Sequence, residues 1–256
     1  MSRGICDGRV VIVTGAGRGI GRAHALALAA AGARVVVNDL GAELDGRGRS
    51  SGPAGEVVDA IRAAGGEAVA NGDDVADWEA AGRLVQAALD AFGRLDVVVN
   101  NAGFVRDRMF VSTAEEEWDA VVRVHLKGHF CVARQAAAHW RDRAKAGEKL
   151  DARIINTSSG AGLQGSIGQS AYSAAKAAIA TLTLVQAAEL RRYGITANAI
   201  APGTIDTPAN RTAMPTADPS RWVRPEEVAA AIVFLTSDEA SGVTGSVLEL
   251  PGHAAG

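Results

Sequence analysis

The chain has 256 residues, 48% of them hydrophobic, and a formal net charge of -3. This is enough apolar material for a large core, and we expect one α/β domain that spans residues 1–256. Because the charged residues are interspersed and form no basic run, nucleic acid is not an expected partner. With no run of about 18 apolar residues, no export signal and only two cysteines, Cys6 and Cys131, we expect a cytoplasmic protein with reduced thiols and no membrane span.

Short runs rich in valine and isoleucine alternate with alanine-rich stretches of helical period, a pattern typical of βαβ units around a buried parallel sheet. The strands are expected at Arg9–Thr14, Arg34–Asn38, Glu67–Ala70, Asp96–Asn100, Arg153–Thr157, Thr196–Ile200 and Ser246–Leu250. The helices are expected near Gly19–Ala31, Gly55–Ala64, Trp78–Phe92, Glu115–Trp140, Ser170–Tyr193 and Pro225–Thr236. This order predicts a doubly wound, seven-stranded parallel sheet with helices on both faces.

Two segments interrupt this alternation, and each follows the carboxyl end of an expected strand. Leu40–Gly55 is rich in glycine, serine and arginine, and Thr204–Arg224 contains three prolines. Open α/β sheets bind their ligands in the loops at this edge of the sheet. We therefore expect these two segments to influence which ligands the protein accepts.

A glycine-rich run joins the first expected strand to the first expected helix. It spans Thr14–Gly21 and contains Gly15, Gly17, Arg18, Gly19, Ile20 and Gly21. Because glycines carry no side chain, a pyrophosphate can approach the backbone amides at a helix N-terminus, where the helix dipole also favours negative charge. An ordinary tight turn is the alternative, but the position between a strand and an amphipathic helix favours dinucleotide binding.

Asp39 follows the second expected strand, about 20 residues after the glycine run. A carboxylate at this place accepts hydrogen bonds from both hydroxyls of an adenosine ribose and repels a 2′-phosphate, which predicts NAD rather than NADP. The alternative is a solvated residue at the end of a strand. Arg47 and Arg49 in the following loop could reach a phosphate, which leaves NADP open.

The segment Arg153–Lys176 contains a group of side chains suited to acid/base chemistry. Ser159 follows the fifth expected strand, and Tyr172 and Lys176, four residues apart, share one face of the next helix. A phenol ionises near pH 10, about three units above neutrality, so it acts as a base at neutral pH only if its phenolate is stabilised. An ammonium one turn away lowers the phenol pKa, so Tyr172 can exchange a proton with an alcohol whose oxygen Ser159 binds. A surface pair is the alternative meaning of an isolated Tyr-x-x-x-Lys.

Five motifs occur in the order and at the spacing of the short-chain dehydrogenase/reductase family, which the chain resembles over nearly its whole length. They are the glycine run, Asn100–Gly103, Ser159, Tyr172 with Lys176, and Pro202 with Gly203. The resemblance implies a single Rossmann-type domain that moves a hydride between a secondary alcohol or its ketone and nicotinamide. It also implies a set of cofactor contacts. Asp74 and Val75 would hold the adenine, and Asn101, Ala102 and Gly103 would lie beside the adenosine. Pro202, Gly203, Ile205 and Thr207 would lie near the nicotinamide, and Lys176 would bind the nicotinamide ribose next to Tyr172.

One position departs from the family pattern, because His125 stands where the family has a catalytic asparagine. A histidine there, together with Val37–Gly41 and Arg106–Arg108, resembles the (3R)-hydroxyacyl-CoA dehydrogenase units of type 2 multifunctional enzymes. That resemblance implies oxidation of fatty 3-hydroxyacyl-CoA thioesters or of steroid hydroxyls with NAD. The segment Thr204–Arg211 instead resembles dihydropteridine reductases, so a broad carbonyl or pterin reductase is the alternative. In the family this region, here residues 204–224, is a lid over the substrate, and its shortness implies an open pocket.

The histidines do not predict a metal site. His125 and His129 are four residues apart, which is metal-ligand spacing, but no third ligand accompanies them. We expect His125 to hold a water or a backbone carbonyl behind the active site. His24, His139 and His253 are expected to be surface or hydrogen-bonded residues.

The remaining expectations concern partners and substrate. Relatives pair the helices Glu115–Trp140 and Ser170–Tyr193 between subunits, so the resemblance implies a homodimer or homotetramer. A catalytically weak NAD(H)-binding sensor is the rival from another functional class, and the joint presence of Ser159, Tyr172 and Lys176 favours an enzyme instead. The small-molecule substrate stays open among a 3-hydroxyacyl thioester, a steroid or other bulky alcohol, and a small carbonyl or pterin.

Overall fold

Seven parallel strands form one sheet in the computed structural model, which describes residues 4–42, 48 and 52–253. In chain order they are β1 (Val10–Thr14), β2 (Arg34–Asn38), β3 (Ala68–Asn71), β4 (Val97–Asn100), β5 (Ala152–Thr157), β6 (Ile195–Pro202) and β7 (Val247–Leu250). Their order across the sheet is β3-β2-β1-β4-β5-β6-β7, with every neighbouring pair parallel. The winding direction reverses between β1 and β4, which confirms the doubly wound fold predicted from the sequence.

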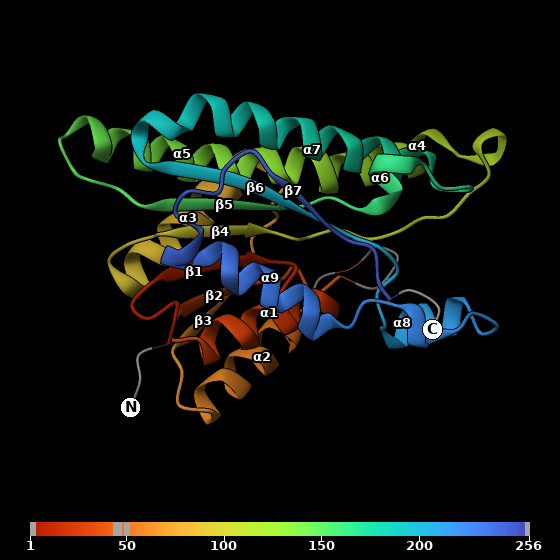
Figure 1. Ribbon diagram of the computed structural model, residues 1–256, viewed down its shortest axis with the longest axis horizontal. Coiled ribbons are helices and arrows are strands. Elements are labelled where there is room, and N and C mark those ends of the chain that lie inside the picture. The colour runs from red at the N-terminus through yellow and green to blue at the C-terminus, as the bar shows by residue number, and fades with distance from the viewer. Residues whose placement is uncertain (1–3, 43–47, 49–51, 254–256) are drawn as a thin grey trace.

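Helices cover both faces of this sheet (Figure 1). On one face lie α1 (Gly19–Ala30), α2 (Gly52–Ala63) and α9 (Pro225–Thr236), and on the other lie α3 (Trp78–Phe92), α4 (Glu115–Val122), α5 (Gly128–Lys145) and α7 (Ser170–Leu190). Two short helices, α6 (Gly160–Gln164) and α8 (Pro208–Ala213), follow β5 and β6, and 3-10 turns occur at Phe110–Ser112, Arg191–Tyr193, Pro219–Arg221 and Asp238–Ala240. None of the helices in the described ranges is long and apolar enough to cross a membrane.

Strand β1 shows why the strands read as continuous apolar runs. All five of its residues are buried. Val11 and Val13 pack on the side of α1, α2 and α9, whereas Val10 and Ile12 pack on the side of α3, α5 and α7. A strand that is covered on both faces favours apolar side chains on both, and β1 is apolar at its first four positions, unlike a strand with one solvated face.

One long helix predicted from the sequence is divided in the structure. The prediction is a single helix over Glu115–Trp140, but a π-helical turn, Arg123–Lys127, separates α4 from α5. Such turns are rare and are frequent at functional sites. His125 lies in this turn and is buried. Hydrophobic periodicity does not reveal the turn because it shifts the pattern by only one residue.

The two segments that interrupt the alternation differ in their structure. α2 begins at Gly52 rather than Gly55, and Arg47 and Arg49 lie outside the described residues. The second segment, residues 204–224, contains α8 and the 3-10 turn Pro219–Arg221, each with a proline in its first turn, where the missing N–H is tolerated. An isolated parallel bridge between Ile205 and Val223 joins the two ends of this segment.

His24 on α1 contradicts the prediction of a surface or hydrogen-bonded residue. Its side chain is fully buried, and neither ring nitrogen has a hydrogen-bond partner among the described residues. Burial lowers its pKa from 6.5 to about 3, so the imidazole is neutral in the folded chain near pH 7. By contrast, His253 is exposed and its Nε2 lies 3.1 Å from Glu227 Oε2, and Cys6 and Cys131 are free thiols, as predicted.

We predict that His24→Leu reduces the loss of stability at acid pH. In the unfolded chain an imidazole binds a proton below its ordinary pKa of 6.5, whereas His24 in the folded chain does so only near pH 3. The unfolded state holds more protons between these values, so the free energy of unfolding falls as the pH falls. Urea titrations from roughly pH 7 to pH 4 should show a slope smaller by up to about 1.4 kcal/mol per pH unit in the variant. Equal slopes in both proteins would contradict this.

Candidate active site

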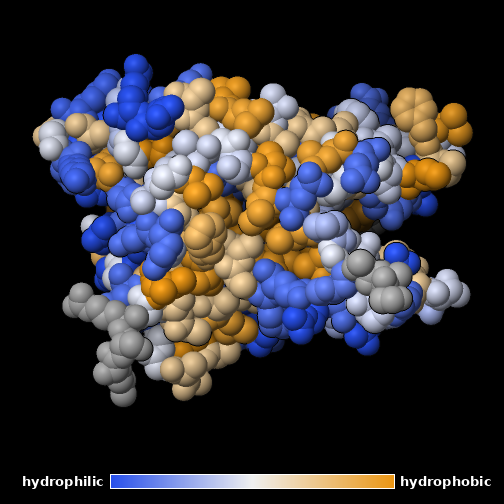
Figure 2. Space-filling model, in the orientation of Figure 1, coloured by the Kyte–Doolittle hydropathy of each residue, from blue (hydrophilic) through white to orange (hydrophobic). Residues whose placement is uncertain are grey.

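The residues that the sequence marks as functional converge on one edge of the sheet. The glycine run follows β1, Asp39 follows β2, Asp74 follows β3, Asn101 follows β4, Ser159 follows β5 and Gly203 follows β6. Parallel strands place their carboxyl ends at the same edge, so these loops are neighbours. The surface is indented there, at the right of the view, between an upper arm with α4 and α6 and a lower arm with α8 (Figure 2).

The glycine run packs so closely against its neighbours that side chains have no room. A Cβ added to Gly15 would lie 2.7 Å from the Cα of Ala102, and one added to Gly21 would lie 2.0 Å from the Gly15 carbonyl oxygen. A Cβ added to Gly17 would lie 2.8 Å from Asp39 Oδ2. The backbone at the start of α1 is therefore free of side chains at these positions, and this cradle fits a dinucleotide pyrophosphate.

The other residues of the run lie at the first turn of α1. Gly19 has a φ of 53°, in the left-handed region that favours glycine. Arg18 is exposed, and its Nη1 donates a hydrogen bond to the Ala42 carbonyl at 2.9 Å. Ile20 is partly buried in the same turn. Arg18 thus links the glycine run to the loop that follows β2.

Asp39 lies next to the glycine run, as the sequence predicts. Its Oδ2 accepts a hydrogen bond from the Gly17 amide at 2.8 Å, and its Oδ1 accepts one from the Gly41 amide at 2.7 Å. These two bonds fix the plane of the carboxylate at the end of β2. Each oxygen keeps a second lone pair, so the group can still accept hydrogen bonds from a ribose.

Thr14 connects the two loops on either side of the cradle, a role that the sequence analysis missed. Its hydroxyl oxygen accepts hydrogen bonds from the amides of Asn101 at 2.9 Å and Ala102 at 3.1 Å. The Asn101 side chain donates to the carbonyls of Thr14 at 3.0 Å and Gly15 at 3.1 Å. The Thr-Gly motif itself was the signal for this role, but only the glycines of the motif were given a function, and its threonine was not.

Asp74 and Val75 lie beside the π-helical turn. Asp74 Oδ2 pairs with Arg123 Nη2 at 2.6 Å, and its Oδ1 accepts a hydrogen bond from the Ala76 amide at 2.9 Å. Val75 is buried, and a Cβ added to Gly128 would lie 2.9 Å from its Cγ2. These contacts tie the loop after β3 to the helix that carries His125.

The acid/base group predicted from the sequence is assembled in the structure. The hydroxyls of Ser159 and Tyr172 lie within hydrogen-bonding reach of each other. Lys176 is buried, its Nζ donates to the Thr157 carbonyl at 2.6 Å, and it lies 5.5 Å from the centre of the Tyr172 ring. Ser159 also caps α6, because its hydroxyl oxygen accepts a hydrogen bond from the Ala161 amide at 3.2 Å.

The phenol pKa differs from the sequence prediction. Burial raises the pKa of Tyr172 above its ordinary value of 10, the hydrogen bond with Ser159 partly offsets this, and the Asp107 charge raises it further. Complete burial also lowers the pKa of Lys176 to about 7. The lysine has therefore lost most of its charge at the pH where a phenol ionises, and it does not lower the phenol pKa as the spacing predicts.

His125 forms one wall of this site. Its ring centre lies 5.2 Å from that of Tyr172 in an edge-to-face arrangement, and its Nε2 lies 2.7 Å from the Phe104 carbonyl oxygen and 3.1 Å from the Phe104 amide. The ring touches Gly103, where an added Cβ would lie 2.2 Å from His125 Cε1. Burial and then the Lys176 charge lower the pKa of His125 to about 3. The predicted contact with a backbone carbonyl is thus present, made by a neutral ring.

The residues expected near the nicotinamide follow β6. Pro202 accepts a hydrogen bond from the Ser159 hydroxyl at 3.5 Å. The Gly203 amide donates to the Leu250 carbonyl at 2.8 Å. Thr207 caps α8, because its hydroxyl oxygen accepts a hydrogen bond from the Asn210 amide at 3.2 Å. Ile205 lies between these two positions and is partly buried. The loop after β6 is thereby placed next to Ser159.

Exposed apolar side chains extend outward from the loops after β4 and β5. Met109, Phe110 and Val111 belong to the loop after β4, and Ile167 belongs to the loop between α6 and α7. The Arg108 amide donates to the Gly168 carbonyl at 2.7 Å, which joins the two loops. Val111 and Ile167 are 93% and 89% exposed, so this apolar segment is a candidate surface for a ligand.

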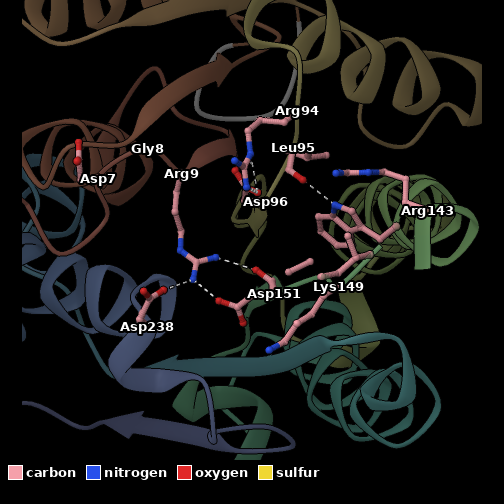
Figure 3. A pocket seen from close by; sticks show the side chains of 13 residues that line it. Asp7, Gly8, Arg9, Arg94, Leu95, Asp96, Arg143, Lys149, Asp151 and Asp238 are labelled. Atoms are coloured by element: carbon pink, nitrogen blue, oxygen red, sulfur yellow. Dashed lines mark hydrogen bonds and ion pairs between the residues drawn. The ribbon is translucent and has the colours of Figure 1, made fainter. Parts of the chain in front are cut away.

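A cavity of about 340 Å³ lies at the opposite edge of the sheet (Figure 3). There Arg9 lies 2.5 Å from both Asp151 and Asp238, and Arg94 pairs with Asp96 at 2.6 Å. The cations and anions of this cavity balance, and Asp96 also accepts a hydrogen bond from the amide of Val10, so these bonds hold β1, β4 and β5 together. In the described ranges, no three metal-binding side chains are grouped.

Comparison with known families agrees with this geometry. A family model described as short chain dehydrogenase matches residues 9–218. The chain belongs to the short-chain dehydrogenase family. Its members are oxidoreductases that use nicotinamide cofactors, so the resemblance drawn from the five motifs is confirmed.

Individual relatives agree with the subfamily resemblance. Hydroxyacyl-CoA dehydrogenase ChsB1 of Mycobacterium tuberculosis is 46% identical over 251 residues, which cover 94% of this chain and 76% of that protein. Peroxisomal multifunctional enzyme type 2 of Mus musculus is 48% identical over 229 residues, which cover 90% of this chain but 30% of the enzyme. The crystal structure of a short chain dehydrogenase from Mycobacterium avium has 61% identity and a TM-score of 0.86, and the match covers 99% of this chain and 87% of that one.

Proposed function

We propose that the chain is an NAD-dependent dehydrogenase that interconverts a secondary alcohol and its ketone, with Tyr172 as the acid/base. The observation that carries this proposal is the grouping of Ser159, Tyr172 and Lys176 beside the glycine cradle. When bound there, the nicotinamide ring accepts or supplies the hydride and is positively charged in its oxidised form.

In this proposal Ser159 and Tyr172 bind the substrate oxygen together. During oxidation the Tyr172 oxygen takes the proton of the alcohol hydroxyl, and during reduction it returns this proton to the ketone oxygen. Burial opposes the phenolate, so the reaction needs positive charge beside the phenol. Lys176, with a pKa of about 7, exchanges protons near neutrality and can supply that charge or pass the proton on. His125 lines the site as a neutral wall beside Tyr172.

For the cofactor, we propose that the amides of the glycine run hold the pyrophosphate and that the loops after the other strands hold the rest. The residues involved are Gly15, Gly17, Arg18, Gly19, Ile20, Gly21, Asp39, Asp74, Val75, Asn101, Ala102, Gly103, Tyr172, Lys176, Pro202, Gly203, Ile205 and Thr207. NAD is favoured because the Asp39 carboxylate is anchored by two amides next to the cradle, where a 2′-phosphate would meet its charge.

For the substrate, we propose a 3-hydroxyacyl thioester or a similarly bulky alcohol. The exposed segment of Met109, Phe110, Val111 and Ile167 supports this, since it offers apolar surface beyond the reacting hydroxyls. The name of the mycobacterial relative, a hydroxyacyl-CoA dehydrogenase, points to the same class. A broad carbonyl or pterin reductase is the alternative within the enzyme class.

We also propose that the protein is a cytoplasmic homodimer or homotetramer. Exposed apolar residues on α5 and α7, Phe130, Leu184 and Val185, support self-association through these helices. A monomeric mass by light scattering at micromolar concentration would refute this.

Tyr172→Phe should abolish turnover and leave NADH binding nearly unchanged, because it removes the exchangeable proton but keeps the ring. We expect kcat to fall by at least about 100-fold. NADH formation should be measured with a 3-hydroxyacyl-CoA, a steroid alcohol and a small alcohol, and NADH affinity by fluorescence. Tyr193→Phe, at the end of α7 and outside the site, is the matched control. Survival of turnover in Tyr172→Phe would remove the acid/base assignment, and NADH binding without turnover of any substrate by the unaltered protein would favour the sensor.

Asp39→Asn should weaken the preference for NADH over NADPH. The substitution keeps the shape of the side chain but removes the charge that repels a 2′-phosphate, and one oxygen that accepts an amide becomes a donor. The ratio of kcat/KM for NADH to that for NADPH should fall by about 10-fold or more. Asp90→Asn, an exposed position on α3, should leave the ratio unchanged. An unaltered protein that uses NADPH better would overturn the cofactor proposal.

A further inference from the structure

A second buried histidine lies four residues beyond His125 and has no part in the chemistry described above. His129, on α5, is 2% exposed. Its ring lies within hydrogen-bonding reach of the backbone at His125 and Asn100, and burial and the Lys176 charge keep its pKa well below 6.5. A neutral imidazole carries one N–H. Since Nε2 has no partner among the described residues, the N–H that bonds these carbonyls is on Nδ1.

Asn100, at the end of β4, also contacts His129 through its own side chain. Its side-chain amide donates to the His129 carbonyl at 3.4 Å and to Asn156 Oδ1 at 3.0 Å. Asn156, on β5, donates in turn to the Thr183 hydroxyl at 2.9 Å and to Gln186 Oε1 at 2.8 Å on α7. The backbone carbonyl of His129 therefore joins the start of α5 to a buried polar network that crosses from β4 through β5 to α7.

The contact between His129 and His125 joins the first turn of α5 to the π-helical turn, which contains His125. In such a turn the backbone bonds run to the fifth residue along the chain, which disturbs the usual pairing of carbonyls with donors. The His129 imidazole adds a donor for the His125 carbonyl at this place. The same turn sets where the His125 ring lies, between Gly103 and the Tyr172 ring.

We propose that His129 is a positioning residue for the reaction, which holds the π-helical turn against the end of β4 so that His125 stays packed on Tyr172. The inference rests on the proposed role of Tyr172. His129 itself touches neither the glycine cradle nor the hydroxyls of Ser159 and Tyr172 in any contact described above. Its loss should therefore change turnover more than cofactor binding.

Two amide substitutions separate this role from simple filling of space. His129→Asn keeps a donor near the position of Nδ1, whereas His129→Gln carries the same amide one carbon further out, near the position of Nε2. We expect His129→Asn to keep most of kcat. His129→Gln and His129→Phe should lower kcat by about 10- to 100-fold, because small displacements of reacting groups are that costly. The affinity for NADH should change by less than about 2-fold in all three.

A double substitution tests whether His129 acts through His125. If it does, His129→Gln added to His125→Ala should cause little further loss of kcat, whereas independent roles give multiplied losses. His139→Phe, partly buried on the same helix, should behave like the unaltered protein and serves as control. Equal kcat in the Asn and Gln variants, or multiplied losses in the double variant, would overturn the inference. Turnover that survives Tyr172→Phe would instead overturn the proposed function.

Discussion

The Lys176 ammonium donates a hydrogen bond to the Thr157 carbonyl at 2.6 Å, and the Ser158 hydroxyl donates back to the Lys176 carbonyl at 2.8 Å. Together these bonds hold the first turns of α7 against the carboxyl end of β5. Tyr172 lies one turn before Lys176, and Ser159 lies directly after Ser158. These two bonds between helix and strand therefore bring the Ser159 and Tyr172 hydroxyls together.

Burial at this contact also sets the electrostatics of the site. A buried ammonium with few acceptors loses solvation, which lowers the pKa of Lys176 to about 7, and the same desolvation lowers the pKa of His125 to about 3. Near neutral pH the His125 ring is therefore neutral, and Lys176 carries only part of its positive charge. The phenol pKa is raised in this state, so the acid/base proposal requires the charge of bound cofactor as well as that of Lys176.

The sequence by itself determined the fold class, the glycine cradle and the grouping of Tyr172 with Lys176. Each of these features is encoded locally. A βαβ unit is recognised from the change in hydrophobic pattern between strand and helix, and glycines mark the close approach of a ligand to a helix N-terminus. A spacing of four residues puts Tyr172 and Lys176 on one helix face. Asp39 was predictable for the same reason, because its place after β2 follows from strand order.

Only the tertiary structure decided how the wall behind Tyr172 is built. The π-helical turn, the burial of His129 and the contact of His125 with Gly103 depend on residues from β4 and the helix meeting across the core. The full burial of His24 and the raised pKa of Tyr172 likewise depend on how much solvent the packed elements exclude. Local sequence patterns do not predict this exclusion of solvent, because the desolvation of a side chain depends on all the elements that surround it in the fold.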